Sequence, residues 1–373
     1  MQQPGEPPTL FILDPSPEVT GAFVAARREA ELLAGSVRCV LVLRTDARIG
    51  EDQLAAFDQV VRLPIQPLRR SAKSLLTYPA GVLRNGRRLA RAMREAGCTR
   101  LQVNDYYLLE GAAARLFGFR GRLATWIRID PANYGGPAAR LWFRAARNAS
   151  DRIVVVSEFL KSQVPVSLEA QVIHDPAADW PLAAAPEGQR LVFIGNYIEG
   201  KGQDLAIRAF HRVAAAYPAA ELIFHGGGLS QLSNRCYRAG LQRIAGRGPG
   251  AGRIHLREFA SDTGQVLDGA LVALNLSRSE SFSLACQEAS GRGVAVIATR
   301  SGGPQEIIED GRTGWLVVVD DEAEVAAAMA EALQDPERTA RMGRVGAALI
   351  RQRFSATAFR SALADVFNLP GSW

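Results

Sequence analysis

Two glutamates, Glu280 and Glu288, stand eight positions apart where the sequence passes from an apolar run through a polar loop into a helical pattern. At 3.6 residues per turn this distance is a little over two turns, so Glu280 belongs to the loop and Glu288 lies deeper along the helix. Carboxylates around a helix start suit a ligand with hydroxylated sugars on both sides of a diphosphate, because the helix N-terminus attracts the phosphates. Taken alone, such a pair is more typical of solvated charges at a helix end.

The elements that must position this pair are two short strands and the helix between them. The apolar runs Leu271–Leu274 and Val294–Ala298 predict buried strands, because each is short and bounded by polar residues. Ser279 or Ser281 can cap the helix, which ends at Gly291. Ligands of an open parallel sheet bind at the carboxyl ends of its strands, so we expect the two glutamates at a binding edge.

A single lysine stands in another predicted strand-to-helix loop, which runs from Gly195 to Gly202. Only three of the 44 basic residues are lysines, and Lys201 is the one in the C-terminal half. The loop lacks the GxxxxGK pattern followed by Ser or Thr, so a P-loop is disfavoured. An ammonium group beside a helix start suits a phosphate as a mobile point charge. A surface lysine is the alternative, but it leaves a lone lysine unexplained where the chain otherwise uses arginine.

The composition is that of a globular protein with room for two domains. The chain has 373 residues, of which 47% are hydrophobic and 22% charged, and no apolar run approaches the roughly 20 residues that span a bilayer. The first residues carry no positive n-region, which predicts that no secretory signal is present. Four cysteines and four histidines are scattered without a CxxC pair, so we expect a reduced, cytoplasmic protein without a structural zinc site.

The formal charge of +6 is concentrated in the first half of the chain. Eight basic residues fall between Arg69 and Arg94 with no acid among them. On a helix, four of them share one face, opposite Leu83 and Leu89–Ala90: Arg84, Arg87, Arg88 and Arg91. Such a segment favours an anionic membrane surface or a phosphorylated substrate, and a solvated arginine-rich face is an equal alternative. We expect no nucleic-acid partner.

Strands and helices alternate in two successive series, separated by a Pro- and Ala-rich segment at 175–189. Such series form parallel sheets with right-handed crossovers. We therefore predict an α/β protein of two doubly wound, Rossmann-like domains that face each other across a cleft. The expected N-terminal domain spans 1–180 and the C-terminal domain spans 190–355, and a last helix is expected within 356–373.

The expected strands of the first series are 9–13, 37–43, 100–104, 123–129, 152–157 and 171–173. Those of the second series are 191–194, 220–224, 256–259, 271–274, 294–298 and 313–318. The longer expected helices are 22–33, 107–116, 203–215, 321–333, 336–354 and 356–367.

Four segments carry a resemblance to a known family: GNYIEGKGQDLAIRAF, LIFHGGG, SESFSLACQEASGRGVAVIATRSGGPQEIIEDGRTGWLV and DPERTARMGRVGAALI. They resemble the retaining GT-B glycosyltransferases of the family-4 type, the glycosyl transferases group 1. The spacing of Glu280 and Glu288 matches the family's E-x7-E motif. The resemblance covers about Leu191 to Phe354, whereas the N-terminal half is similar only in strand order and in Ser157 followed by a helix.

The resemblance implies that the N-terminal domain binds the acceptor and that the last helix packs back on it. It also implies that the C-terminal domain contains a donor site for a nucleotide-diphospho-sugar. Glu288 would bind the ribose hydroxyls, Glu280 would sit beside the transferred sugar, and Lys201 would neutralise the diphosphate. Backbone amides of residues 282–284 would cradle the phosphates. The remaining positions that it implies for the donor are Gly195, Asn196, Gly226, Phe259, Phe282, Ser283, Leu284, Gly302 and Gly303.

In the N-terminal domain, Thr20 and Gly21 match the family's glycine loop, which lies against the diphosphate and the acceptor. Two positions depart from the family. Asn196 stands where members often have arginine, so one phosphate charge is missing, and the histidine that usually touches the sugar is absent. Either Arg128 or Asp130 takes the place of this histidine, or the chain recognises the sugar in a way that differs from the family. The residue pattern alone leaves two interpretations of Arg128 and Asp130, which stand at the end of a buried strand. They contact a ligand, or they form an internal salt bridge.

The activity that the resemblance implies is retaining hexosyl transfer to a lipid-linked or polysaccharide acceptor in cell-surface glycan biosynthesis, at the inner face of the membrane. The catalytic residues would be Glu280, Lys201, Asp130 and Arg128, with the leaving phosphate as the base for the acceptor hydroxyl. No acidic pair suits a metal, since Asp320–Asp321 is typical of a helix cap, so we expect no metal and no cofactor besides the donor substrate. A catalytically weakened nucleotide-sugar-binding protein is the alternative. A GT-B epimerase is disfavoured, because its acid and base residues cannot be placed.

Overall fold

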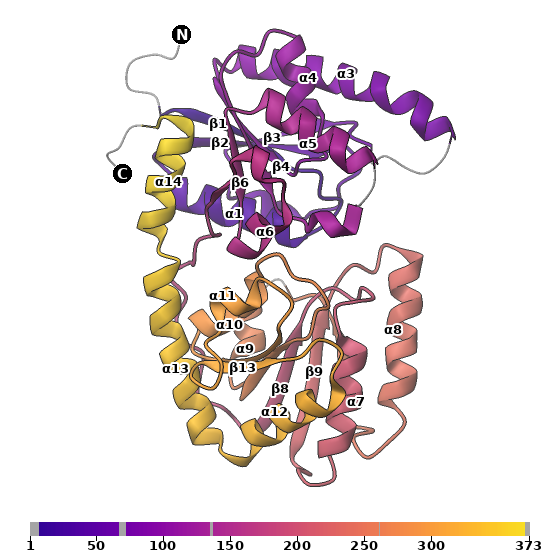
Figure 1. Ribbon diagram of the computed structural model, residues 1–373. Coiled ribbons are helices and arrows are strands. Elements are labelled where there is room, and N and C mark those ends of the chain that lie inside the picture. The colour runs from indigo at the N-terminus through magenta and orange to yellow at the C-terminus, as the bar shows by residue number, and fades with distance from the viewer. Residues whose placement is uncertain (1–6, 67–71, 135–136, 261, 370–373) are drawn as a thin grey trace. The chain divides into compact units, whose positions relative to one another are not determined.

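The computed structural model describes residues 7–66, 72–134, 137–260 and 262–369 (Figure 1). The chain divides into two compact units. The first joins Met1–Pro176 to Ala356–Trp373, and the second is Ala177–Ser355. In the segment that the sequence marks as a linker, 175–189, residues 175–188 contain no helix or strand, and Gln189 is the first residue of the next strand. The cleft expected between the two domains stays a prediction.

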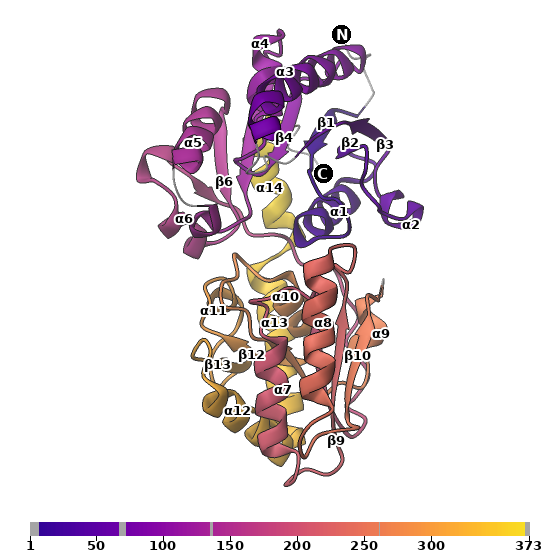
Figure 2. The same cartoon turned by 90° about the vertical axis from the view of Figure 1, so that its right-hand side faces the viewer.

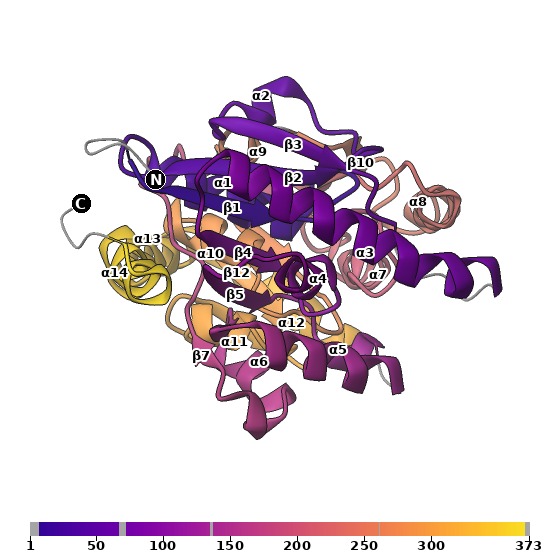
Figure 3. The same ribbon diagram turned by 90° about the horizontal axis from the view of Figure 1, so that it is seen from above.

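The first unit contains a sheet of seven parallel strands in the order β3-β2-β1-β4-β5-β6-β7. Its strands are β1 Thr9–Leu13, β2 Arg38–Arg44, β3 Gln59–Leu63, β4 Arg100–Asn104, β5 Arg122–Ile127, β6 Arg152–Val155 and β7 Gln171–Val172. Figure 3 shows β3, β2, β1, β4 and β5 following one another across the sheet. The order changes direction between β1 and β4, as it does in a doubly wound sheet.

Helices cover both faces of this sheet. They are α1 Gly21–Leu33, α2 Glu51–Leu54, α3 Ala72–Glu95, α4 Glu110–Leu116, α5 Pro137–Ala149, α6 Glu158–Gln163 and α14 Ala356–Phe367, with short 3-10 turns at Pro131–Tyr134 and Val166–Leu168. The ring of Phe367 stacks on Trp126 of β5, with ring centroids 5.9 Å apart. Arg360 donates hydrogen bonds to the carbonyl oxygen of Leu32 at the end of α1. The last helix therefore packs on the sheet of the first unit.

The second unit has a parallel sheet of six strands in the order β10-β9-β8-β11-β12-β13. These are β8 Gln189–Ile194, β9 Ala220–Gly226, β10 Ile254–Glu258, β11 Val272–Asn275, β12 Ala295–Thr299 and β13 Gly314–Val317. The helices are α7 Gln203–Val213, α8 Leu232–Ala245, α9 Thr263–Leu267, α10 Leu284–Gly291, α11 Pro304–Ile307, α12 Glu322–Gln334 and α13 Pro336–Arg353. Figure 2 shows α7 and α8 side by side, and Phe210 of α7 belongs to the core that contains Phe193 and Phe224 of the sheet.

The structure confirms two doubly wound parallel sheets, and most expected strands agree to within one or two residues. The sequence analysis assigns no element to α2, β3, α5 or α8, so these four were missed. β3 is an edge strand whose residues are mostly half-buried or exposed, so it lacks the continuous apolar run of the inner strands. α5 begins at the proline of a Gly-Gly-Pro sequence that is typical of a loop, although proline is well accepted at a helix start.

The basic segment lies on α3. Its four arginines on one face are exposed as expected: Arg84, Arg87, Arg88 and Arg91. Leu83 is exposed too, which corrects the expectation that it lies on the buried face. Gly86 occupies the close approach to α4 instead, because a Cβ atom there would overlap Ala113. Three members of the segment lie outside the part described: Arg69, Arg70 and the side chain of Lys73.

None of the helices in the described ranges is both long enough and apolar enough to cross a bilayer.

Two glycines of α13 provide a test of the packing of the second unit. A Cβ atom at Gly343 would overlap the carbonyl oxygen of Gly293 and lie 2.9 Å from the amide nitrogen of Ala295, whereas one at Gly346 would meet nothing nearer than 3.6 Å. We expect Gly343→Ala to lower the free energy of unfolding by about 1–3 kcal/mol, as overpacking does. Gly346→Ala, the matched control, should leave it unchanged or raise it by up to about 1 kcal/mol, because alanine favours helix. Urea denaturation measures both, and equal stabilities would contradict this packing.

Candidate functional site

Two loops of the second unit touch at the carboxyl ends of β8 and β11. The first, 195–202, connects β8 to α7, and the second, 276–283, connects β11 to α10. Gly202 has a φ of +84°, and a Cβ atom at this position would overlap the carbonyl group of Leu276. Both the backbone angle and the space require glycine, so Gly202 is what lets the two loops approach.

The contact between these loops brings Lys201 to Glu280. The ammonium nitrogen of Lys201 lies 2.7 Å from Oε2 of Glu280, and the same oxygen accepts a hydrogen bond from Oγ of Ser277 over 2.9 Å. The side chains of Lys201 and Glu280 are 34% and 17% exposed, so the pair is half-buried but reaches solvent. An ammonium group has three donors, and Lys201 can therefore hold Glu280 and a second anion together.

A third loop closes on Glu280 from the end of β12. The amide of Glu280 donates to the carbonyl oxygen of Ser301 over 3.0 Å, and the amide of Gly303 donates to the carbonyl oxygen of Glu280 over 2.8 Å. A Cβ atom at Gly303 would overlap the backbone of Phe282, and Gly302 has a φ of +113°. Gly302 and Gly303 are predicted to allow close approach around a donor, and in the structure they allow the close contact between these two loops.

The cap of α10 is Ser283, and not Ser279 or Ser281 as the sequence predicts. Oγ of Ser283 accepts hydrogen bonds from the amide of Cys286 over 3.2 Å and from Nδ2 of Asn275 over 2.8 Å. The helix begins later because the chain as far as residue 282 is held by the neighbouring loops. Ser283 has a φ of +84°, a conformation that costs a residue with a side chain on the order of 1–3 kcal/mol.

The start of α10 offers donors for an anion. In the part of the chain that the structure describes, no group accepts a hydrogen bond from the amides of Leu284 and Ala285. Such amides, together with the helix dipole, attract negative charge. Burial raises the pKa of the Cys286 thiol in the same turn to about 12, so this cysteine is not a thiolate nucleophile at neutral pH.

Glu288 has partners of its own. Oε1 of Glu288 accepts a hydrogen bond from Oγ1 of Thr263 and lies 3.3 Å from Nε of Arg292, one helical turn further on. Its side chain is nearly buried. The structure therefore gives Glu280 and Glu288 different partners, although one helix start separates them. Thr263 escaped the sequence analysis, because only the folded chain brings the start of α9 to α10.

The predicted donor positions Asn196, Gly226 and Phe259 gather at the ends of β8, β9 and β10. Oδ1 of Asn196 accepts a hydrogen bond from the amide of Gly227 over 3.2 Å, and a Cβ atom at Gly226 would overlap the carbonyl oxygen of Gly195. Phe259 is 47% exposed and borders a cavity of about 430 Å³. Asn196, which stands where family members often have arginine, therefore joins two loops here.

In the first unit, hydrogen bonds connect Thr20 to Arg128. Oγ1 of Thr20 lies 2.6 Å from Oγ of Ser16, whose amide donates to Asp14 over 2.9 Å. Asp14 accepts from Nδ2 of Asn104 over 3.1 Å, and Oδ1 of Asn104 accepts from Nε of Arg128 over 3.5 Å. Asp14 and Asn104 come directly after β1 and at the end of β4. Polar residues at the ends of apolar strands were the signal that could have found them.

The neighbouring predicted positions have separate environments. Thr20 caps α1, and a Cβ atom at Gly21 would meet nothing within 4 Å. Packing within the unit therefore does not require glycine there, and its approach to a ligand stays a prediction. Asp130 accepts a hydrogen bond from the amide of Ala132 over 2.9 Å and so shapes the turn after β5.

Arg128 forms a buried ion pair, but its partner is Asp175 and not Asp130. Nη1 of Arg128 lies 2.7 Å from Oδ1 of Asp175, and both side chains are 5% exposed. Nη2 is buried without a hydrogen-bond partner in the described structure. Burial disfavours the charge of Arg128, but the attraction of Asp175 outweighs it and raises the pKa of the guanidinium group. An internal salt bridge is thus present, while the role of Arg128 toward a sugar stays a prediction.

Buried carboxyl groups surround this arginine. Burial raises the pKa of Glu29 to about 7 and that of Asp105 to about 7, and it also raises the pKa of Asp14. Glu29 accepts a hydrogen bond from Nε2 of Gln102 over 2.8 Å, which opposes the rise without cancelling it. Part of this cluster is therefore protonated near neutral pH.

The protonation of Glu29 predicts how stability depends on pH. Because the pKa of Glu29 is about 7 in the folded chain, against an ordinary 4.5, its contribution is full below pH 4.5 and is lost as the pH rises through 7. The loss is roughly 3 kcal/mol between these limits. We expect Glu29→Gln to flatten the fall of the unfolding free energy from pH 5 to pH 8, measured by denaturation, while Glu31→Gln on the exposed side of the same helix should not. Parallel curves for the native chain and Glu29→Gln would contradict this.

A family model described as "Glycosyl transferases group 1" matches residues 188–335. The chain is 29% identical over 269 residues to the GDP-mannose-dependent alpha-(1-6)-phosphatidylinositol monomannoside mannosyltransferase of Mycolicibacterium smegmatis, covering 63% of this chain and 69% of that protein. It is 31% identical over 199 residues to D-inositol 3-phosphate glycosyltransferase 2 of Catenulispora acidiphila. This alignment covers 52% of this chain and 46% of that protein, which is less than half of its length.

Solved structures share the fold over almost the whole chain. HepE of Anabaena in complex with UDP and glucose superposes with a TM-score of 0.81 at 18% identity, covering 96% of this chain and 99% of that one. Sucrose-phosphate synthase of Thermosynechococcus elongatus gives 0.78 at 16% identity, with 97% and 98% covered. The chain therefore has the two-domain GT-B fold, and its segment 188–335 is similar to the glycosyl transferases group 1.

Proposed function

We propose that this protein transfers a hexose from a nucleotide-diphospho-sugar to a lipid-linked or polysaccharide acceptor, with retention of configuration, in cell-surface glycan biosynthesis. The observation that carries the proposal is the pairing of Lys201 with Glu280 next to the start of α10, where two backbone amides lack an acceptor in the described part of the chain. One cation, two amides and a helix dipole meet in a half-buried place, and this suits the charge of a departing diphosphate.

The two ends of such a donor would meet different residues. In this proposal Glu288 accepts hydrogen bonds from the ribose hydroxyls, and the base lies toward Phe259 and its cavity. The transferred sugar lies beside Glu280, which also keeps Lys201 in place. The relatives support a donor of this class, because the printed name of one specifies GDP-mannose and the structure of HepE contains UDP and glucose.

The mechanism is proposed to need no metal. Asp321 caps α12 by accepting a hydrogen bond from the amide of Glu324, and Asp320 lies 2.9 Å from Nε of Arg278. Both carboxylates therefore already have partners within the chain. Lys201 and the amides of α10 would then stabilise the leaving phosphate, whose oxygen takes the proton of the acceptor hydroxyl on the same face. Arg128, with its unpaired Nη2, or Asp130 would contact the sugar from the first unit.

Replacing the site residues tests the proposal. Lys201→Ala should lower turnover roughly 100-fold, which is typical for the loss of one group that stabilises a leaving charge. Glu288→Gln should weaken donor binding about tenfold or more, the cost of a hydrogen bond to a charged group. Calorimetric titration with UDP-, GDP- and ADP-sugars, followed by transfer assays with the donor that binds, measures both effects.

The matched control is Lys161→Ala, which removes an exposed lysine of α6 and should leave turnover and affinity unchanged. Unaltered turnover in both site variants would refute the assignment. The alternative, a catalytically weakened donor-binding protein, is favoured by Asn196, which supplies no charge, and by the pairing of Arg128 with Asp175. Donor binding without transfer and without slow hydrolysis that keeps the anomeric configuration would support that alternative.

The exposed arginines of α3 support contact with an anionic membrane, as a lipid-linked acceptor would require. Each basic residue near such a surface contributes about 1 kcal/mol. We expect the combined replacement of Arg84, Arg87, Arg88 and Arg91 by glutamine to reduce binding to phosphatidylglycerol vesicles at least tenfold in a sedimentation assay. The control replaces four exposed arginines of the second unit in the same way: Arg243, Arg247, Arg344 and Arg351. Equal losses in both variants would mean that net charge alone decides, and would contradict a membrane face on α3.

A further inference from the structure

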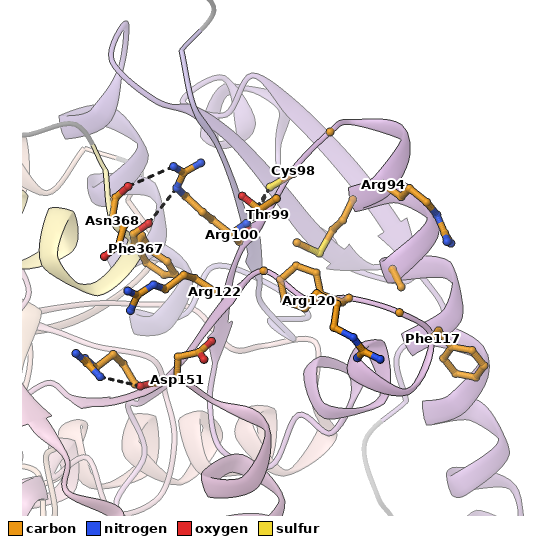
Figure 4. A pocket seen from close by; sticks show the side chains of 17 residues that line it. Arg94, Cys98, Thr99, Arg100, Phe117, Arg120, Arg122, Asp151, Phe367 and Asn368 are labelled. Carbon is orange, nitrogen blue, oxygen red and sulfur yellow. Dashed lines mark hydrogen bonds between the residues drawn. The ribbon is translucent and has the colours of Figure 1, made fainter. Parts of the chain in front are cut away.

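A cavity of about 1050 Å³ opens at the amino ends of β4, β5 and β6 in the first unit (Figure 4). The residues assigned to sugar transfer in this unit, such as Arg128, follow the carboxyl ends of the strands, where doubly wound sheets bind their substrates. β5 has six residues, and at 3.3 Å per residue it separates the two edges by roughly 20 Å. The cavity is therefore distinct from the proposed transfer site.

The lining of this cavity is strongly basic. Among the residues that the structure describes, five arginines line it: Arg94, Arg100, Arg120, Arg122 and Arg152. Asp151 supplies the one carboxylate among these described lining residues. Its Oδ2 already accepts hydrogen bonds from Arg115 over 2.7 Å and from the amide of Leu123 over 2.8 Å. The lining thus has an excess of positive charge that its own acid does not compensate.

Three of these arginines are the first residues of three neighbouring strands. Arg100 of β4 and Arg122 of β5 are register partners, and Arg152 of β6 pairs with Ala124, two positions after Arg122. Register partners and alternate residues point to the same face of a sheet, so the three guanidinium groups project from one face. Like charges directly opposite each other destabilise a sheet unless another group compensates them.

Within the described chain, no carboxylate forms an ion pair with the three arginines of this row, and that of Asp151 pairs with Arg115 instead. Arg100 donates to the carbonyl oxygens of Phe367 over 3.1 Å and Asn368 over 3.3 Å, which are neutral acceptors. Arg152 donates to the carbonyl oxygen of Asp151 over 3.1 Å. Within the described residues, the guanidinium group of Arg122 has no hydrogen-bond or ion-pair partner. Burial lowers the pKa of Arg100, as expected for a half-buried cation without a counter-charge.

Capping of helix ends accounts for only part of the arrangement. Arg100 binds carbonyl groups at the end of α14, and Arg120 donates to the carbonyl oxygen of Arg115 at the end of α4 over 3.2 Å. Cations at helix C-termini are favourable in themselves. Neither contact involves Arg122 of β5, which is the register partner of Arg100 of β4. A ligand that binds both guanidinium groups would explain why this pair is arginine on both strands.

We propose that the cavity binds a small, elongated ligand with two or more phosphate groups, which bridge Arg100, Arg122 and Arg152. The planar guanidinium group binds phosphate oxygens in pairs, so a row of such groups suits consecutive phosphates. In Figure 4, Arg100 and Arg122 extend toward Phe367 and Asn368, whereas Arg94 and Arg120 lie at the other end of the cavity. A ligand with charge at both ends would use both groups of arginines. The lining is concave although open to solvent, and a concave site favours a small molecule over the flat surface of a membrane.

The test uses the full chain carrying Lys201→Ala, so that phosphate binding at the proposed donor site is weakened and the result does not depend on transfer. Inorganic tripolyphosphate is titrated calorimetrically at physiological salt. We expect binding that weakens about tenfold on Arg122→Gln, in line with the loss of one charge-assisted contact, and is lost when Arg152→Gln is added. Arg122 makes no contact that folding requires in the described structure, and Arg243→Gln on α8 is the matched control, expected to change nothing.

Competition identifies the source of the phosphates. ATP and fructose 1,6-bisphosphate are titrated against bound tripolyphosphate, and displacement by the first supports a nucleotide, while displacement by the second supports a sugar phosphate. Unchanged tripolyphosphate binding in the double arginine variant would overturn the proposal. So would a double variant that keeps tripolyphosphate but no longer sediments with phosphatidylglycerol vesicles, because the arginines would then serve a membrane.

Discussion

The close approach of three loops in the second unit is the constraint on which the candidate site depends. Gly202 lies against Leu276, and Gly303 lies against the backbone of Phe282, in spaces that no side chain can share. A half-exposed ion pair contributes only about 0–1 kcal/mol, so the pair of Lys201 and Glu280 does not hold these loops together. The glycines permit the approach, and backbone hydrogen bonds hold it, such as those from Arg278 to Gly200 over 2.9 Å and from Gly303 to Glu280 over 2.8 Å, so the ion pair follows from this contact. Lys201 is thereby kept beside the start of α10 instead of extending into solvent.

A different principle governs the carboxyl edge of the first unit. Arg128 is buried among carboxyl groups, and Asp175 compensates its charge directly. Burial raises the pKa of Glu29 and Asp105 to about 7, so the remaining acids stay partly neutral instead of repelling one another. A buried ion pair of this kind is weak support for stability, because desolvation offsets the attraction. Its clearer consequence is that the guanidinium group of Arg128 is held in one position, where Nη2 has no hydrogen-bond partner in the described structure.

Much of the fold followed from short apolar runs with polar boundaries, because parallel strands that are covered on both faces must be apolar throughout. β3 at the sheet edge lacks that pattern, and α5 begins behind a loop signal. The spacing of Glu280 from Glu288 indicated Glu280 as a candidate site residue, and the scarcity of lysine in the chain indicated Lys201. The partners could not be read in this way, since Asp175 lies 47 positions from Arg128 and Thr263 reaches Glu288 only through packing. Nor does any local signal announce a positive φ at Ser283, which moved the helix start.

The two ends of β5 show how context changes what one residue type does. At the carboxyl end, Arg128 has a carboxylate at 2.7 Å and lies within a connected network, so its charge is satisfied by the chain itself. At the amino end, Arg122 stands in register with Arg100, and the described chain offers this pair only carbonyl groups. Composition cannot separate these cases, because both count equally toward the net charge. Register can: two cations facing each other on adjacent strands are a cost unless an anion lies between them, and that cost is the physical reason to seek a ligand at this edge.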